Sequence, residues 1–210
     1  MEFEIPRLYA ITDRRLSGLS HFDQVVLLIK GGATLIQIRD KDSTPDDLYR
    51  AAVACIKVAR PLGVRTIIND RADVALAADA DGVHLGQDDL PAEEARRLLG
   101  DDRIVGVSTH TIEQAVAAAS SCVDYVAIGP VFATATKENP GPIVGLSKIA
   151  EARRGIEKPL VAIGGITLER ARDVILAGAD SLAVISDLYI SADIAGRTKE
   201  FINKLSRRGD

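Results

Sequence analysis

The chain has 210 residues, 47% of them hydrophobic, which is enough for one sizeable core, and we predict one domain over residues 1–210. The formal net charge of −4 argues against a nucleic-acid partner held by a general basic surface, although a local pocket could still bind an anionic metabolite. No run of about 18 apolar residues is present to span a membrane. The acidic residues 1–6 do not fit a signal peptide, so we expect a cytoplasmic protein.

The cysteines, Cys55 and Cys122, lack metal-ligand spacing and lie in alanine- or valine-rich surroundings. We therefore expect buried free thiols and neither a disulfide nor a nucleophile. The sequence leaves the oligomeric state open, a homo-oligomer included.

Short β-branched runs alternate with Ala- and Leu-rich stretches of helical spacing along the chain. We predict strands at 8–11, 35–38, 65–68, 82–85, 104–107, 125–128, 160–163 and 182–184. The predicted helices are 22–31, 46–60, 72–78, 92–99, 112–120, 147–154, 168–177 and 192–205. Phrases such as Ala-Asp-Gly, Val-Asp-Tyr and Gly-Ala-Asp recur before strands, as in a regular repeat. Eight such units predict an α/β fold, a single-domain (β/α)8 TIM barrel, with an open doubly wound sheet as the alternative.

Polar residues follow almost every predicted strand. The carboxyl ends of barrel strands form one rim, which is where the active sites of this fold lie. Asp, Asn, Ser and Gly also cap turns and helices, but a whole rim of polar strand ends favours a shared site. The rim residues that we single out are Gln37, Arg39, Lys41, Asn69, Asp70, Asp89, Ser108, Gly165, Ile185 and Ser186.

The stretch 129–145 has neither helical nor strand periodicity and predicts a long loop after the sixth strand. Structureless loops longer than about 12 residues are usually functional or disordered. Thr134, Thr136 and Lys137 supply two hydroxyls and an ammonium group, which suit the oxygens of a phosphate. We expect a lid that becomes ordered when anionic ligands bind.

The rim also divides by charge. Arg39, Lys41 and Lys137 offer positive groups, whereas Asp70 and Asp89 offer carboxylate oxygens from neighbouring units. This combination favours Mg²⁺ bridging the protein and a diphosphate. A general acid and base pair formed by the two carboxylates is the alternative.

A second phosphate site is predicted at the ends of the last two strands. Gly164 and Gly165 follow the seventh strand, and Ile185 and Ser186 follow the eighth. Backbone amides of these two loops commonly bind phosphate in barrels. Paired glycines can also form a plain tight turn.

Seven motifs, in order along most of the chain, resemble those of the thiamine-phosphate synthase family. They are Leu8-Tyr9-Ala10-Ile11-Thr12-Asp13, Gln37-Ile38-Arg39-Asp40-Lys41, Asn69-Asp70, Gly82-Val83-His84-Leu85-Gly86-Gln87-Asp88-Asp89-Leu90, Gly106-Val107-Ser108, Gly129-Pro130-Val131-Phe132 with Thr134, Thr136 and Lys137, and Ile163-Gly164-Gly165-Ile166. The resemblance implies a (β/α)8 transferase that joins 4-amino-2-methyl-5-pyrimidinylmethyl diphosphate to 4-methyl-5-(2-phosphooxyethyl)thiazole. Thiamine phosphate and diphosphate would be the products of a dissociative, Mg²⁺-assisted reaction.

The resemblance also implies a role for each rim residue. It makes Asp70 and Asp89 the Mg²⁺ ligands. It places around the diphosphate Arg39, Lys41, Asn69, Ser108 and Lys137. It makes Gln37 a contact of the pyrimidine and places on the thiazole-phosphate side Thr134, Thr136, the Gly165 amide and the Ile185-Ser186 backbone. The candidate catalytic residues are Gln37, Ser108 and Lys137.

Three points stay open in the sequence. His84 is either a pocket residue or a satisfied core histidine, and His110 is expected only to cap a helix. A thiazole tautomerase branch of the same superfamily is a competing identity, but it places a histidine where Pro130 stands. A regulatory protein that binds a phosphorylated metabolite without turnover is a second alternative.

Overall fold

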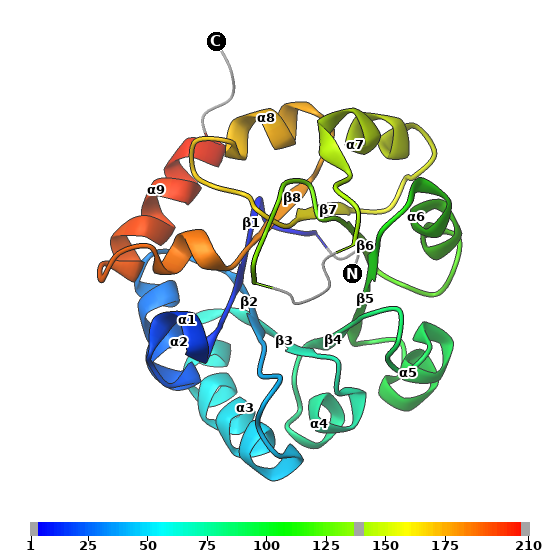
Figure 1. Cartoon of the computed structure of the whole chain (residues 1–210). Coiled ribbons are helices and arrows are strands. Elements are labelled where there is room, and N and C mark those ends of the chain that lie inside the picture. The colour runs from blue at the N-terminus through cyan, green and yellow to red at the C-terminus, as the bar shows by residue number, and fades with distance from the viewer. Residues whose placement is uncertain (1–3, 137–140, 207–210) are drawn as a thin grey trace.

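The computed structural model describes residues 4–136 and 141–206. Eight parallel strands form a closed barrel in sequence order, and Figure 1 looks along it, with the helices on the outside. The strands are β1 (Leu8–Ile11), β2 (Leu35–Ile38), β3 (Arg65–Asn69), β4 (Gly82–Leu85), β5 (Ile104–Thr109), β6 (Tyr125–Ile128), β7 (Leu160–Ile163) and β8 (Ser181–Val184). β8 pairs with β1 through Leu8 and Leu182, which confirms the TIM barrel and excludes the open sheet.

The predicted helices are all present, with bounds that differ by at most three residues. They are α2 (His21–Lys30), α3 (Pro45–Ala59), α4 (Ala72–Ala77), α5 (Ala92–Leu99), α6 (Ile112–Ala119), α7 (Gly145–Arg154), α8 (Ala171–Leu176) and α9 (Ile194–Ser206). Within residues 4–136 and 141–206, three short elements were not predicted: α1 (Arg14–Ser17), η1 (Arg60–Leu62) and η2 (Ser186–Tyr189). Each spans about one turn, which is too short to show a helical period.

The strands are mostly apolar because they face two separate apolar layers. In β1, Leu8 and Ala10 belong to the large layer between the strands and the helices. Tyr9 and Ile11 belong to a smaller cluster that fills the barrel interior. Alternate residues of one strand therefore stabilise different layers. The side chains of the interior layer lie beneath the space that the rim encloses.

The recurring Asp before strands has a structural role. Asp81, Asp124 and Asp180 precede β4, β6 and β8, and the carboxylate of each accepts a hydrogen bond from an amide near the start of the preceding strand. The amide donors belong to Thr66, Val105 and Leu160, at distances of 2.7, 2.7 and 2.8 Å. These carboxylates satisfy backbone donors at the end of the barrel opposite the rim.

Both cysteines are free thiols, as expected, but only Cys55 is buried, whereas Cys122 is half-buried. Burial raises the pKa of the Cys55 thiol, so this residue is a poor nucleophile. In residues 4–136 and 141–206, no helix is both long enough and apolar enough to cross a membrane.

Candidate functional site

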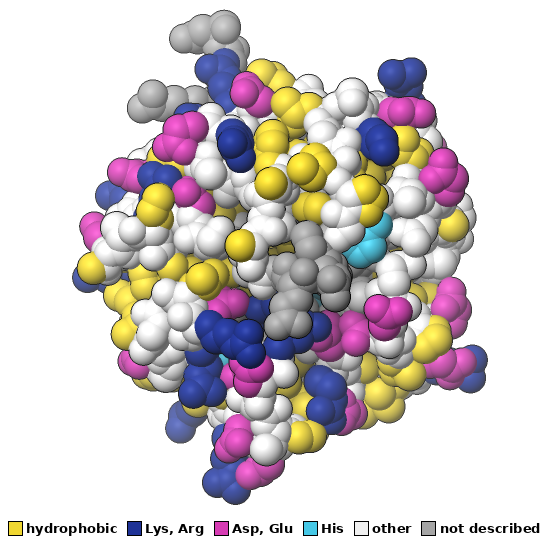
Figure 2. Space-filling view, in the orientation of Figure 1, with side chains coloured by type: hydrophobic (Ala, Val, Ile, Leu, Met, Phe, Trp, Pro, Cys, Tyr) yellow, Lys and Arg dark blue, Asp and Glu magenta, His cyan; other side chains and the backbone are white. Residues whose placement is uncertain are grey.

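A cavity of about 230 Å³ opens among the carboxyl ends of the strands. Figure 2 shows this face, on which Lys, Arg, Asp and Glu side chains gather over the β2 to β4 side of the barrel. Every rim residue predicted from the sequence lines the cavity, and so do Thr134 and Thr136. Lys137, the remaining predicted residue, lies outside the described part of the chain. The structure therefore brings the described candidates into one site, while their individual roles remain predictions.

Asp70 and Asp89 form the acidic part of the cavity. Asp70 directly follows β3 and adopts a φ of +63°, a conformation that non-glycine residues seldom adopt. Its backbone amide is fixed by a 2.7 Å hydrogen bond to the carbonyl of His84. The Asp89 carboxylate accepts a 2.6 Å hydrogen bond from the amide of Gly86. Burial and the nearby Asp70 carboxylate raise the pKa of Asp89, so a bound cation would relieve the proximity of these two negative charges.

The positive groups beside the acidic pair are already engaged with carboxylates, which the sequence did not predict. Lys41 Nζ lies 2.5 Å from Asp70 Oδ2, and Arg39 Nη1 lies 2.8 Å from Asp13 Oδ2. Half of the Lys41 side chain is exposed, so this ion pair contributes little energy and Lys41 can turn to an incoming anion. Arg39 and Asp13 are more buried and hold a fixed position at the edge of the cavity.

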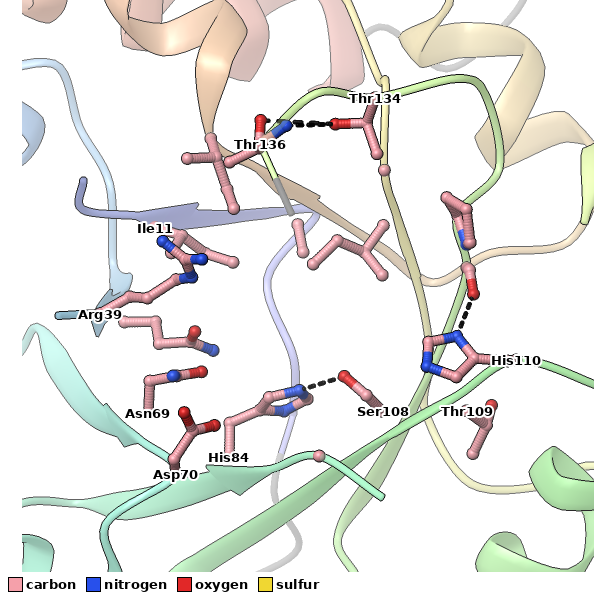
Figure 3. Close-up of a pocket in the computed structure, with 18 of the residues that line it drawn as sticks. Ile11, Arg39, Asn69, Asp70, His84, Ser108, Thr109, His110, Thr134 and Thr136 are labelled. Carbon is pink, nitrogen blue, oxygen red and sulfur yellow. Dashed lines mark hydrogen bonds between the residues drawn. The ribbon is translucent and has the colours of Figure 1, made fainter. Parts of the chain in front are cut away.

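Asn69 is the last residue of β3 and points into the cavity from the side that also carries Arg39 and Asp70 (Figure 3). Its side chain is buried, and within the described residues its Nδ2 has no hydrogen-bond partner. A buried amide donor without a partner is uncommon and destabilising. A ligand acceptor in the cavity would satisfy it.

The opposite side of the cavity combines the loops after β6 and β7. Phe132 N donates a 3.0 Å hydrogen bond to Gly164 O, and the Thr134 and Thr136 hydroxyls lie 3.4 Å apart (Figure 3). Gly165 has a φ of +63°, and a Cβ there would lie 2.4 Å from the carbonyl oxygen of Ala133. Glycine is therefore required for these two loops to approach one another.

A buried ion pair supports the loops after β7 and β8, and it was not predicted. Asp187, in η2, accepts a 3.0 Å hydrogen bond from Leu168 N and one of 2.7 Å from Arg197 Nη2 of α9. Only 5% of the Asp187 side chain is exposed. This carboxylate joins the two loops that were predicted to bind phosphate to the outer helix, and so fixes the position of Ser186 next to it.

Five side chains form a continuous hydrogen-bonded chain across the floor of the cavity. Gln37 Nε2 donates to Tyr9 Oη at 2.8 Å, and Tyr9 Oη lies 3.0 Å from Tyr125 Oη. His84 Nδ1 lies 2.8 Å from Tyr125 Oη, and His84 Nε2 lies 2.8 Å from Ser108 Oγ. His84 is thus both a cavity residue and a satisfied buried histidine. This series of hydrogen bonds was not predicted from the sequence, because Tyr9 and Tyr125 lie within apolar strands and resemble ordinary core residues.

The expectation that His110 caps a helix is wrong. Thr111 is the N-cap of α6, and its hydroxyl accepts from Gln114 N. The His110 ring lines the cavity, and its Nδ1 donates a 2.7 Å hydrogen bond to Gly129 O (Figure 3). A carbonyl oxygen can only accept, so the proton of this hydrogen bond is carried by Nδ1.

The buried imidazole of His84 makes the stability of the protein depend on pH. Burial lowers the pKa of His84 to about 4, although the nearby Asp89 carboxylate opposes the shift. Between the unfolded value of about 6.5 and this folded value, only the unfolded chain binds the proton. We expect the free energy of unfolding to fall as the pH falls through this window, by up to about 3 kcal/mol in total.

Denaturant titrations at pH 7.5 and 4.5 on the wild type and on His84→Gln would measure this effect. Burial also lowers the pKa of His21, so that residue contributes to the pH dependence of both proteins, and the difference between them isolates His84. The same loss of stability in wild type and His84→Gln would show that His84 titrates normally.

A family model described as thiamine monophosphate synthase matches residues 8–188. A thiamine-phosphate synthase from Koribacter versatilis is 47% identical over 209 residues, which covers 96% of this chain and 97% of the relative. One from Methanoculleus marisnigri is 44% identical over 200 residues, or 95% of each chain. The solved structure of thiamine phosphate pyrophosphorylase from Pyrococcus furiosus matches with a TM-score of 0.87 and 34% identity, over 96% of this chain and 97% of that one. By its sequence motifs, its barrel and these matches, the chain belongs to the thiamine monophosphate synthase family.

Proposed function

We propose that the chain is a thiamine-phosphate synthase that couples 4-amino-2-methyl-5-pyrimidinylmethyl diphosphate with 4-methyl-5-(2-phosphooxyethyl)thiazole. The observation that carries the proposal is that one cavity has acidic and basic side chains around Asp70 on one side and the loop of Gly165 on another. Two anionic substrates can occupy the two sides at once. The names of the close relatives support the same activity.

The residues of the acidic side fit Mg²⁺. Asp70 and Asp89 supply hard carboxylate oxygens, and these are the residues that would hold the ion. The described residues contain no cluster of three or more His, Cys, Asp or Glu side chains that could hold a metal, which suits an ion that completes its coordination with substrate oxygens and water. When bound there, Mg²⁺ would neutralise charge on the diphosphate.

The protein groups around the diphosphate act by position and charge. We propose that Lys41 leaves Asp70 to contact the diphosphate, with Arg39, the unpartnered Asn69 amide and the Ser108 hydroxyl beside it. Lys137 is assigned to the same group from the sequence. The carbon–oxygen bond to the diphosphate breaks first, and the electron pair leaves with the diphosphate. Protein donors aimed at that developing charge lower the barrier without any covalent step.

We propose that the remaining residues orient the pyrimidine and the thiazole for the bond that joins them. We propose that Gln37 contacts the pyrimidine, because it lies at the floor of the cavity and its amide is fixed by Tyr9. Thr134, Thr136 and the backbone of Gly165 and of the Ile185-Ser186 segment bind the thiazole phosphate. In this arrangement the thiazole nitrogen attacks the pyrimidinylmethyl carbon, forming the carbon–nitrogen bond of thiamine phosphate.

The purified chain should form thiamine phosphate and diphosphate in equal amounts when it is given both substrates and Mg²⁺. Chromatography of thiamine phosphate together with a coupled diphosphate assay measures both products. A thiazole tautomerase would consume a thiazole phosphate isomer and release no diphosphate, and a regulatory protein would bind the thiazole phosphate without turnover. Binding without coupled product under any divalent cation would refute the synthase assignment.

We further infer a cytoplasmic location, as expected of a biosynthetic enzyme that acts on small phosphorylated substrates.

A further inference from the structure

The hydrogen-bonded chain on the cavity floor links two predicted substrate contacts, Gln37 and Ser108, through three buried residues with no assigned role. These are Tyr9, Tyr125 and His84. Their rings are held firmly: Tyr9 and Tyr125 meet edge to face at 5.8 Å, and His84 stacks on Tyr125 at 5.6 Å. The fold therefore fixes the positions of the hydroxyl and imidazole groups in this hydrogen-bonded series.

The direction of donation along this series of hydrogen bonds can be followed from Gln37. Its Nε2 can only donate, so the Tyr9 oxygen accepts from it at 2.8 Å. Either phenol could donate in the Tyr9–Tyr125 pair, whose oxygens lie 3.0 Å apart, but only donation by Tyr9 gives the buried Tyr9 hydrogen an acceptor among the described residues. In this arrangement Tyr125 already accepts from Tyr9, so its own hydrogen goes to His84 Nδ1, 2.8 Å away.

The direction of donation along these hydrogen bonds then sets the tautomer of His84. A neutral imidazole whose Nδ1 accepts carries its proton on Nε2. Nε2 therefore donates to Ser108 Oγ, 2.8 Å away. The hydrogen of the Ser108 hydroxyl is left to point at an acceptor in the cavity. In the opposite tautomer, Ser108 would donate to Nε2 and would have no hydrogen left for a ligand.

We propose that Tyr125 is a positioning residue that, through the His84 tautomer, makes Ser108 a hydrogen-bond donor to the anion in the cavity. The identity of that anion as the leaving diphosphate rests on the proposed function. The Tyr125 ring packs directly on the backbone of β5, because a Cβ on Gly106 would lie 2.0 Å from that ring. Tyr9 joins Gln37 to the same chain and holds the amide on the pyrimidine side.

The test uses two matched variants, Tyr125→Phe and Tyr9→Phe, each of which removes one buried oxygen and keeps the ring. Long-range proton–nitrogen correlation spectra of the ¹⁵N-histidine-labelled protein report the tautomer, and the signals of His84 are those lost in His84→Gln. We expect the wild-type ring to carry its proton on Nε2. Tyr125→Phe should shift both His84 nitrogens toward the opposite or averaged tautomer, whereas Tyr9→Phe should keep the wild-type pattern because Tyr125 can still donate.

Binding and turnover measure the consequence for Ser108. Tyr125→Phe should lower kcat about tenfold, the scale of one hydrogen bond to a charged group, with the KM for the thiazole phosphate unchanged. Its affinity for inorganic diphosphate with Mg²⁺ should fall by a similar factor. A proton on Nδ1 of wild-type His84, or wild-type diphosphate affinity in a folded Tyr125→Phe, would overturn the proposal. Failure of the wild type to make thiamine phosphate would instead refute the synthase assignment, because the spectra and diphosphate binding need no turnover.

Discussion

Asp70→Asn and Asp89→Asn are each expected to lower turnover by about two to three orders of magnitude while the fold stays intact. Each substitution removes one negative oxygen from the pair that would hold Mg²⁺ but keeps the size of the side chain. Asn tolerates the left-handed backbone conformation that Asp70 adopts, so no backbone strain is added there. Loss of Asp70 also leaves Lys41 without its 2.5 Å partner, which costs little because this pair is partly exposed.

Steady-state rates measured against Mg²⁺ concentration test this prediction. The apparent affinity for Mg²⁺ should weaken in both variants, and thermal unfolding should change little. Asp42→Asn is the matched control, because Asp42 lies on the same face but pairs with Arg15 at the exposed surface. Unaltered Mg²⁺ titrations in both test variants would remove Asp70 and Asp89 from the metal site, whereas severe unfolding would assign them a structural role.

Ser108→Ala is expected to lower kcat by about a hundredfold, with a smaller effect on the KM for the thiazole phosphate. Its hydroxyl is held 2.8 Å from His84 Nε2 and lines the cavity. A donor fixed in advance toward the leaving group stabilises the charge that develops as the carbon–oxygen bond breaks. The same donor contributes less to substrate binding, where the charge on the bridging oxygen has not yet grown.

Ser186→Ala is the matched control for Ser108→Ala. It is the same change on the same rim, but the contact proposed at Ser186 is made by the backbone. Initial rates with each substrate varied in turn separate the effects on kcat and KM. Ser186→Ala should leave kcat within a few-fold of the wild type. Equal losses in the two variants would show that the effect comes from general disturbance of the rim and not from a donor at the diphosphate.

The sequence by itself determined the barrel, because local chemistry carries the signal. Parallel strands buried on both faces are short and apolar, and helices that cover them on one side have an apolar stripe. The two patterns alternate along the whole chain, so the predicted bounds of the strands and helices lie close to the observed ones. The rim residues could also be predicted from the sequence, because polar residues such as Asn69 and Ser108 occur at the ends of otherwise apolar strands. The fold then places all those ends together.

Only the tertiary structure decided which rim groups touch. Tyr9 and Tyr125 are 116 residues apart, and their hydroxyls meet only because β1 and β6 face each other across the barrel interior. Nothing in the sequence distinguishes them from core tyrosines. The contact of Lys41 with Asp70 joins the ends of two strands, and the ring of His110 turns into the cavity to reach Gly129 O. Side-chain direction and hydrogen-bond partners depend on distances between strands, and these distances exist only once the barrel has closed.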